Sequence, residues 1–132
     1  MKKNLWIIIA VVSACLFAFT GCKKDKDDSS PNASKSKIVG KWYYDRSIER
    51  DKDDNETDTE VFTDGEYLMF NEDGTAYDSF DGDYASWRVS DNQLILTVAG
   101  DQAVLEIKKL TNNQLVLYHN SSESEGTLYL KR

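Results

Sequence analysis

Residues 87–110 read WRVSDNQLILTVAGDQAVLEIKKL, and this stretch decides the fold. Apolar and polar side chains alternate along it, and the apolar set includes Leu94, Leu96 and Val98. An alternation with a period of two is typical of a strand that buries one face and exposes the other. Asp91-Asn92 and Gly100-Asp101 interrupt the alternation with residues that favour tight turns. The stretch therefore predicts consecutive antiparallel strands joined by hairpins.

The same pattern continues on both sides of this stretch, from Gly40 to the end of the chain. Helical spacing of apolar residues is absent apart from a single turn around residues 35–39. The strands we expect are 41–50, 59–63, 66–71, 75–80, 84–90, 93–99, 103–110, 114–119 and 127–131. Their short links favour an up-and-down meander, and closure of the sheet removes its exposed edges. The prediction is an all-β fold, a small antiparallel up-and-down β-barrel of eight or nine strands.

Length and composition restrict the possibilities further. The chain has 132 residues, of which 40% are hydrophobic, so it forms one domain with a core of its own. Its formal charge is −7, and it becomes −9, with 14 basic and 23 acidic residues, if Lys2 and Lys3 are removed with an amino-terminal signal. Such an acidic surface excludes nucleic acid as a partner.

The amino terminus has the pattern of an export signal. A short basic start precedes an apolar run over residues 5–19, which is too short for a comfortable bilayer span. The ending Gly21-Cys22 resembles the lipobox of bacterial lipoproteins. That resemblance implies a signal peptide over residues 1–21 and a lipid anchor, with acyl chains such as palmitate, on Cys22. Two alternatives remain: Cys15 as the lipidated residue, or an uncleaved membrane helix over residues 5–22.

A polar stretch over residues 22–36 follows and contains the only proline of the chain. We interpret it as a flexible tether. The cluster Lys26-Asp27-Asp28 resembles the acidic export signal of Bacteroidetes lipoproteins, which implies an outer-membrane protein exposed on the cell surface. The alternative is a solvated linker without a sorting role.

Two motifs in the remainder resemble one family. The segment Ile38-Val39-Gly40-Lys41-Trp42 is similar to the Gly-x-Trp opening of lipocalins, whose tryptophan closes the bottom of the barrel. The segment LMFNEDGT at 68–75, followed by Trp87 and Leu94, looks like the pattern of the lipocalin-like lipoproteins of Bacteroidetes. The resemblance implies a lipocalin-like, or calycin-like, barrel over residues 37–132.

A barrel of eight strands either is filled by its side chains or holds one small ligand. In the first hypothesis the domain is a non-catalytic binding module for a small apolar or amphipathic ligand. The candidate ligand contacts are inward-facing residues: Trp42, Phe70, Trp87, Leu96 and Leu117. In the second hypothesis the barrel is filled, and the acidic loop over residues 51–60 meets a protein partner. An exposed patch of outward-facing tyrosines would favour the second hypothesis.

Catalysis and metal binding find little support in the residues. His119 is the only histidine, so a site with two imidazoles cannot form in one chain, and its alternation with Leu115 and Leu117 places it at a strand end near the barrel mouth. If Cys22 is acylated and Cys15 removed, no thiol remains for catalysis. The loop from Asp51 fails the EF-hand pattern, although weak surface calcium binding there stays an alternative. We expect no enzyme activity, no metal and no cofactor.

Overall fold

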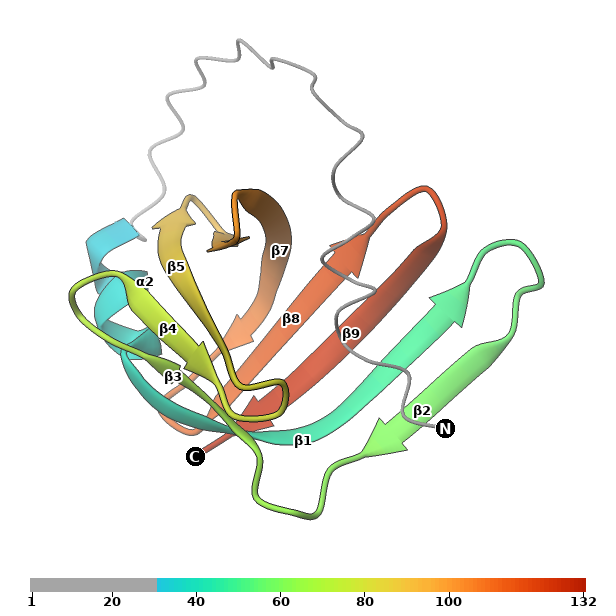
Figure 1. The fold of residues 1–132 in the computed structure, drawn as a ribbon, viewed down its shortest axis with the longest axis horizontal. Helices are drawn as coiled ribbons and strands as arrows, with labels where there is room; N and C mark the ends of the chain where they lie inside the picture. The colour runs from blue at the N-terminus through green and yellow to red at the C-terminus, as the bar shows by residue number, and fades with distance from the viewer. Residues whose placement is uncertain (1–30) are drawn as a thin grey trace, which may run out of the picture.

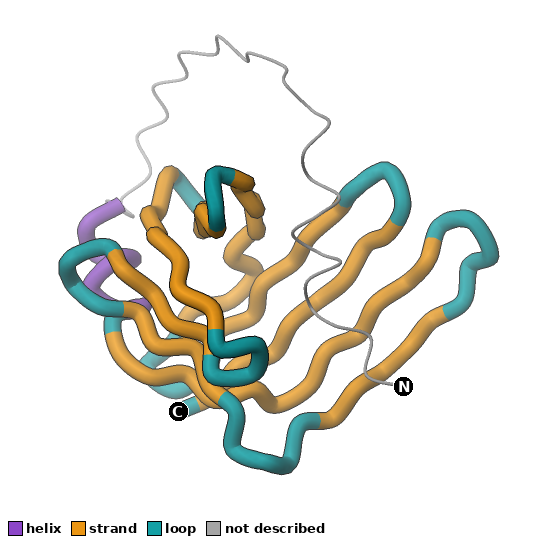
Figure 2. The backbone as a smooth tube through the Cα atoms, viewed as in Figure 1, coloured by secondary structure: helices purple, strands orange, loops and turns teal. Residues whose placement is uncertain are grey.

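The computed structural model describes residues 31–132, which form one sheet of nine antiparallel strands and one helix (Figures 1 and 2). The predicted signal segment 1–21, Cys22 and residues 22–30 of the predicted tether lie outside the described residues. The strands are β1 Gly40–Asp51, β2 Thr57–Val61, β3 Tyr67–Phe70, β4 Thr75–Asp78, β5 Asp83–Ser90, β6 Gln93–Val98, β7 Asp101–Leu110, β8 Gln114–Asn120 and β9 Ser124–Lys131.

The sheet closes on itself through β1. The first half of β1 pairs with β3, where Trp42 lies opposite Leu68, and β1 also pairs along most of its length with β9. Eight strands therefore form a closed barrel, and the expected lipocalin-like β-barrel is confirmed. The ninth strand, β2, pairs only with the second half of β1 and flares away from the barrel (Figure 1).

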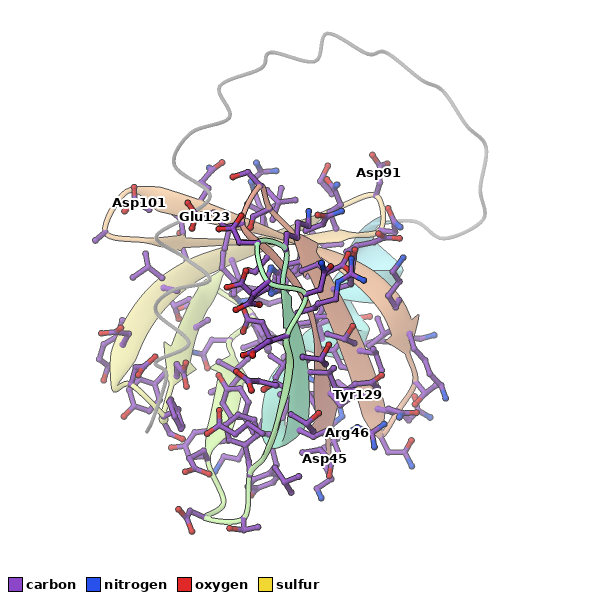
Figure 3. The ribbon with its side chains drawn as sticks, turned by 90° about the vertical axis from the view of Figure 1, so that its right-hand side faces the viewer. Asp45, Arg46, Asp91, Asp101, Glu123 and Tyr129 are labelled. Carbon is purple, nitrogen blue, oxygen red and sulfur yellow. The ribbon has the colours of Figure 1, made fainter. Side chains whose placement is uncertain are left out.

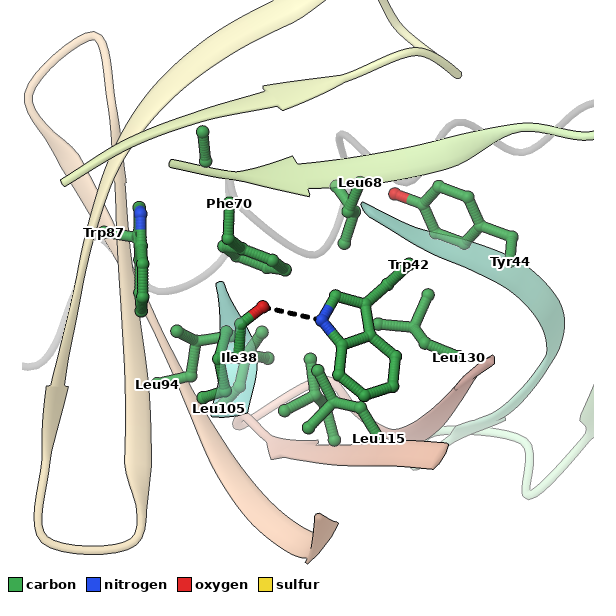
Figure 4. Close-up of a cluster of buried hydrophobic side chains, with 12 residues drawn as sticks. Ile38, Trp42, Tyr44, Leu68, Phe70, Trp87, Leu94, Leu105, Leu115 and Leu130 are labelled. Carbon is green, nitrogen blue, oxygen red and sulfur yellow. Dashed lines mark hydrogen bonds between the residues drawn. The ribbon is translucent and has the colours of Figure 1, made fainter. Parts of the chain in front are cut away.

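The helix α2, Pro31–Ile38, is longer than the single turn expected from the sequence and overlaps the end of the predicted tether. Its sequence has no apolar periodicity, so an argument from periodicity cannot detect it. Tertiary contacts hold it instead: Ile38 is fully buried, and the indole Nε1 of Trp42 donates a 2.7 Å hydrogen bond to the Ile38 carbonyl (Figure 4). The helix contacts β5 and β7, so it covers one end of the barrel.

This closed end contains the densest part of the core. Phe70 and Trp87 meet edge to face with their ring centroids 5.2 Å apart, and Leu94 and Leu115 are fully buried in the same cluster (Figure 4). Arg132 covers the outside of this end, with its guanidinium carbon 4.0 Å from the centroid of the Trp42 ring. The closed end is therefore packed with apolar side chains and sealed by α2 and Arg132.

Two irregularities in the strands change which side chains face inward. The pairing of β1 with β9 shifts between Tyr44 and Arg46, so Asp45 is an extra residue. Before this bulge the even-numbered residues Trp42 and Tyr44 are buried, whereas after it Glu49 lies opposite Gly126 on the inner side. The bulge therefore turns a carboxylate toward the barrel interior, near its open end. The second irregularity is a shift in the pairing of β7 with β8 between Ile107 and Lys109.

Candidate ligand-binding site

The barrel wall is lower on one side of the open end. Strands β3 and β4 have four residues each, whereas β1 has twelve and β7 has ten, and β2 diverges from the barrel instead of extending the wall. A cavity of about 80 Å³ lies behind this low side. All eight barrel strands contribute to its lining, so its shape depends on closure of the whole barrel.

Most of the cavity wall is apolar. The side chains on it are chiefly aliphatic and come from strands that are distant in the sequence: Leu68, Ala85, Leu96, Val98, Ala103, Leu105, Leu117 and Leu128. Several of these residues follow the predicted alternation, as Leu96 and Val98 do on β6 and Ala103 and Leu105 do on β7. A surface of this kind favours the apolar part of a small molecule.

A hydrogen-bonded pair of polar side chains forms one side of the cavity. The Tyr44 hydroxyl donates a 3.0 Å hydrogen bond to Asp78 Oδ2, and the Phe80 backbone N–H donates one of 2.9 Å to Oδ1. Phe62 and Phe80 pack against the Tyr44 ring, with centroids 4.9 and 6.2 Å from it. This aromatic cover limits the access of water to the pair.

Acidic neighbours add to the effect of burial at this position. Desolvation raises the pKa of Asp78 to about 6, and the charges of Asp81 and Asp83 contribute in the same direction. Burial together with the Asp83 charge also raises the pKa of Asp81, and burial and Asp78 hold the pKa of Tyr44 well above 10. This side of the cavity is thus a concentration of carboxyl groups, with Asp78 partly buried and Asp81 exposed at the edge.

His119 belongs to another part of the cavity wall, on β8. Its side chain lies over Gly126, because a Cβ atom at position 126 would be 2.5 Å from the imidazole Nε2. His119 is only 9% exposed, and its buried Nε2 has no hydrogen-bond partner among the described residues, while Glu49 Oε1 is 3.8 Å away. Desolvation lowers the pKa of His119 more than the carboxylates of Glu49 and Glu125 raise it, so the ring is neutral at neutral pH.

The structure separates the candidate contacts named from the sequence into two groups. Leu96 and Leu117 line the cavity. Trp42, Phe70 and Trp87 instead pack in the core of the closed end, where they are 0–4% exposed, and they do not line the cavity.

The acidic side of the site is not evident from the local sequence pattern. Asp81-Gly82-Asp83 has the composition of a simple hairpin turn, and Asp78 lies on the same side of the expected strand 75–80 as Ala76 and Phe80, a side on which a packed core is the ordinary expectation. One signal is available, since this turn carries three carboxylates within six residues of chain, next to the aromatic Phe80.

The outer surface carries a second feature that the sequence analysis anticipated. Tyr43, Tyr67, Tyr77 and Tyr84 lie side by side across β1, β3, β4 and β5, with successive ring centroids 6.3, 6.2 and 4.9 Å apart. We call this row the tyrosine ladder. Tyr129 is not part of it and pairs with Arg46 on another part of the surface (Figure 3).

The acidic loop expected over residues 51–60 is built partly as a strand. Residues 57–60 belong to β2, whose five side chains are all exposed. The turn before β2 is stabilised by the Asp51 and Asp54 carboxylates, which accept hydrogen bonds from backbone N–H groups.

Within residues 31–132 no group of three His, Cys, Asp or Glu side chains is arranged to hold a metal ion. None of the helices described there has the length and apolar character needed to cross a bilayer.

A closed antiparallel barrel with one sealed end and one open, largely apolar cavity defines the class of small lipocalin-type barrels. The family model of the lipocalin-like domain matches residues 38–117, and the chain belongs to this family. Among solved structures, a lipocalin-like protein from Bacteroides uniformis ATCC 8492 is similar in fold, with a TM-score of 0.52 and 9% sequence identity. The match covers 73% of this chain and 98% of that one. None of the curated proteins matches the chain. This fold is typical of binding proteins rather than enzymes.

Proposed function

We propose that this protein is a non-catalytic, lipid-anchored binding module that takes a small apolar or amphipathic molecule into the open end of its barrel. The observation that carries this proposal is the apolar cavity behind the low side of the wall. The anchor would be acyl groups on Cys22 in the outer membrane, with the barrel exposed at the cell surface. The Gly21-Cys22 ending and the polar segment after it support the anchoring part of the proposal.

The size of the cavity restricts the ligand. Drug-sized molecules occupy pockets of roughly 300–1,000 Å³, and an apolar cavity of about 150 Å³ in another protein takes up benzene. A volume of about 80 Å³ therefore suits a chain of a few carbons, and any larger part of the ligand would remain outside the mouth. Long acyl chains fit this site poorly.

Ligand binding is tested by native mass spectrometry of the full chain, purified gently from its own host. Ala85 lines the cavity, and Ala85→Leu would fill part of it, whereas Ser86→Leu adds the same side chain to the exposed face of the same strand. We expect a co-purifying small mass in the wild type and in Ser86→Leu, and its loss in Ala85→Leu. A wild type that carries no mass and takes up no apolar dye would contradict the proposal.

Anchoring is tested separately by metabolic labelling with an alkyne analogue of palmitate. Cys22→Ser should abolish the label and release the protein from the membrane fraction, while Cys15→Ser should leave both unchanged. Loss of the label in Cys15→Ser alone would move the anchor to Cys15.

A second candidate function is protein binding, and the tyrosine ladder is the observation that favours it. Tyr84 is 77% exposed at the end of the ladder, and aromatic side chains are enriched at protein interfaces. In this alternative the acidic loop over residues 51–60 would add contacts at the rim. Surface cross-linking in the host that is lost in Tyr84→Ser but retained in Ala85→Leu would favour protein binding over cavity binding.

A further inference from the structure

The charged residues on the cavity wall are acidic. The titratable residues of the lining are Tyr44, Tyr77, Asp78, Asp81, Asp83 and His119. Among the described residues, no lysine or arginine lines the cavity. Burial keeps His119 neutral, so the described wall presents three carboxyl groups to the cavity and no positive charge.

We propose that the cavity selects a small organic cation, with an ammonium group at Asp78, Asp81 and Asp83, a short apolar body along the leucine wall, and a hydrogen-bonding group at His119. This inference rests on the proposed function, because it names the chemical class of the ligand for the same cavity.

The geometry of the acidic side carries the first step. Both oxygens of Asp78 already accept hydrogen bonds from fixed donors, the Tyr44 hydroxyl and the Phe80 N–H, so the carboxylate is oriented before any ligand arrives. An oriented carboxylate that is shielded from water forms strong charge-assisted hydrogen bonds with N–H donors. The repulsion from Asp81 and Asp83 that raises the pKa of Asp78 would be relieved by a bound cation.

His119 gives an independent indication that a ligand is expected here. A buried polar nitrogen without a partner destabilises a fold, and native proteins rarely leave one. His119 is nine-tenths buried on the cavity wall, and within residues 31–132 its Nε2 finds no hydrogen-bond partner. Gly126 leaves room for the ring, since any larger residue at that position would collide with Nε2. Nε2 itself is packed against Gly126, so the ring would turn toward the cavity to accept a hydrogen bond from a hydroxyl or similar group on the ligand.

The apolar wall between these two polar positions determines the body of the ligand. Leu68, Leu96, Leu105 and Leu117 contact the cavity from four different strands and offer no hydrogen bonds through their side chains. The cavity volume of about 80 Å³ suits a short aliphatic segment. The expected ligand is therefore a short amine with a second polar group, not a fatty acid.

The test uses isothermal titration calorimetry with the full chain in phosphatidylcholine nanodiscs, with empty nanodiscs as the blank. The probes are n-alkylammonium ions from propyl to hexyl, the neutral alcohols and the carboxylates of the same lengths, and the corresponding amino alcohols. Calcium chloride is a further probe, because clustered carboxylates also attract calcium.

We expect the ammonium ions to bind at least about tenfold more tightly than the alcohols, and the carboxylates to show no binding. Asp78→Asn should weaken ammonium binding about tenfold. Asp81→Asn, at an exposed position where the fold tolerates substitution, should weaken it about threefold. Asp91→Asn changes the net charge equally at the other end of β5 and should leave binding unchanged. Amino alcohols of the best length should gain affinity over alkylammonium ions in the wild type and lose that gain in His119→Leu.

The outcomes separate this inference from the proposed function. Alcohols that bind as tightly as ammonium ions, with no effect of Asp78→Asn or Asp81→Asn, would overturn the inference and leave an apolar ligand site. Calcium binding that displaces the amines and depends on the same aspartates would also overturn it. If His119→Leu leaves the preference for amino alcohols unchanged, the assignment of His119 is wrong. Failure of every organic probe to bind would contradict the proposed function itself.

Discussion

Among the glycines of residues 31–132, Gly126 has the least room for a side chain. Gly126→Ala would place a methyl group 2.5 Å from His119 Nε2 and 3.1 Å from the Ile48 carbonyl oxygen, so we expect it to lower the free energy of unfolding by about 2 kcal/mol. In a His119→Ala background the same substitution should cost about 1 kcal/mol less, because the ring is gone. Urea unfolding of the four proteins measures this coupling. Strictly additive costs would show that the imidazole does not lie over Gly126.

The raised pKa of Asp78 predicts that the free energy of unfolding depends on pH. Its pKa is about 6 in the folded protein and 3.8 for an unperturbed aspartate, so the folded state binds the extra proton between these values. The free energy of unfolding therefore falls as pH rises from about 4 to about 6, by about 1–2 kcal/mol after allowance for partial exposure. Urea unfolding at both pH values should show this contribution missing in Asp78→Asn and retained in Asp91→Asn. An equal fall in both variants would contradict the raised pKa.

Among the strands, β2 is the one most weakly tied to the rest of the barrel. It pairs only with β1, and all five of its side chains are exposed, whereas β8 is paired on both sides and largely buried. Local opening needs less free energy where few apolar contacts are lost. We expect the β2 amides that bond to β1 to exchange with deuterium at least about 100-fold faster than those of β8. Equal protection would mean that β2 opens only when the whole barrel unfolds.

For the whole molecule, Arg132 links segments from both ends of the described chain. Its guanidinium donates hydrogen bonds to the carbonyls of Lys37, Val39 and Asn112, at 2.7–2.9 Å. Arg132→Ala should therefore lower the free energy of unfolding of the entire barrel by about 1–3 kcal/mol, and Arg132→Lys by less, because an ammonium keeps the charge but cannot span three carbonyls. Thermal unfolding measures both. Arg88→Ala, on the exposed face of β5, serves as the control and should change stability by less than about 0.5 kcal/mol.

The sequence by itself determined the strands, their hairpins and most of the inward-facing residues. Strand alternation and turn formation depend on residues that are close together in the chain, so the local sequence indicates them. Examples are the alternation on 93–99 and 103–110 and the turns at Asp91-Asn92 and Gly100-Asp101. The nine predicted strands match the observed strands to within a few residues at each end. The same reasoning placed Leu96 and Leu117 inside the barrel.

Only the tertiary structure decided what chemistry the open end of the barrel presents. At the closed end, Trp42 bonds to its near neighbour Ile38, but Arg132 reaches the Trp42 ring only after the two ends of the domain have come together. The bulge at Asp45 turns Glu49 inward, although nothing in the local alternation indicates it, and only closure of the barrel brings Asp78 to the wall of a cavity. Strand register and the height of the barrel wall are set by pairing between distant segments, and a periodicity of two contains no information about them.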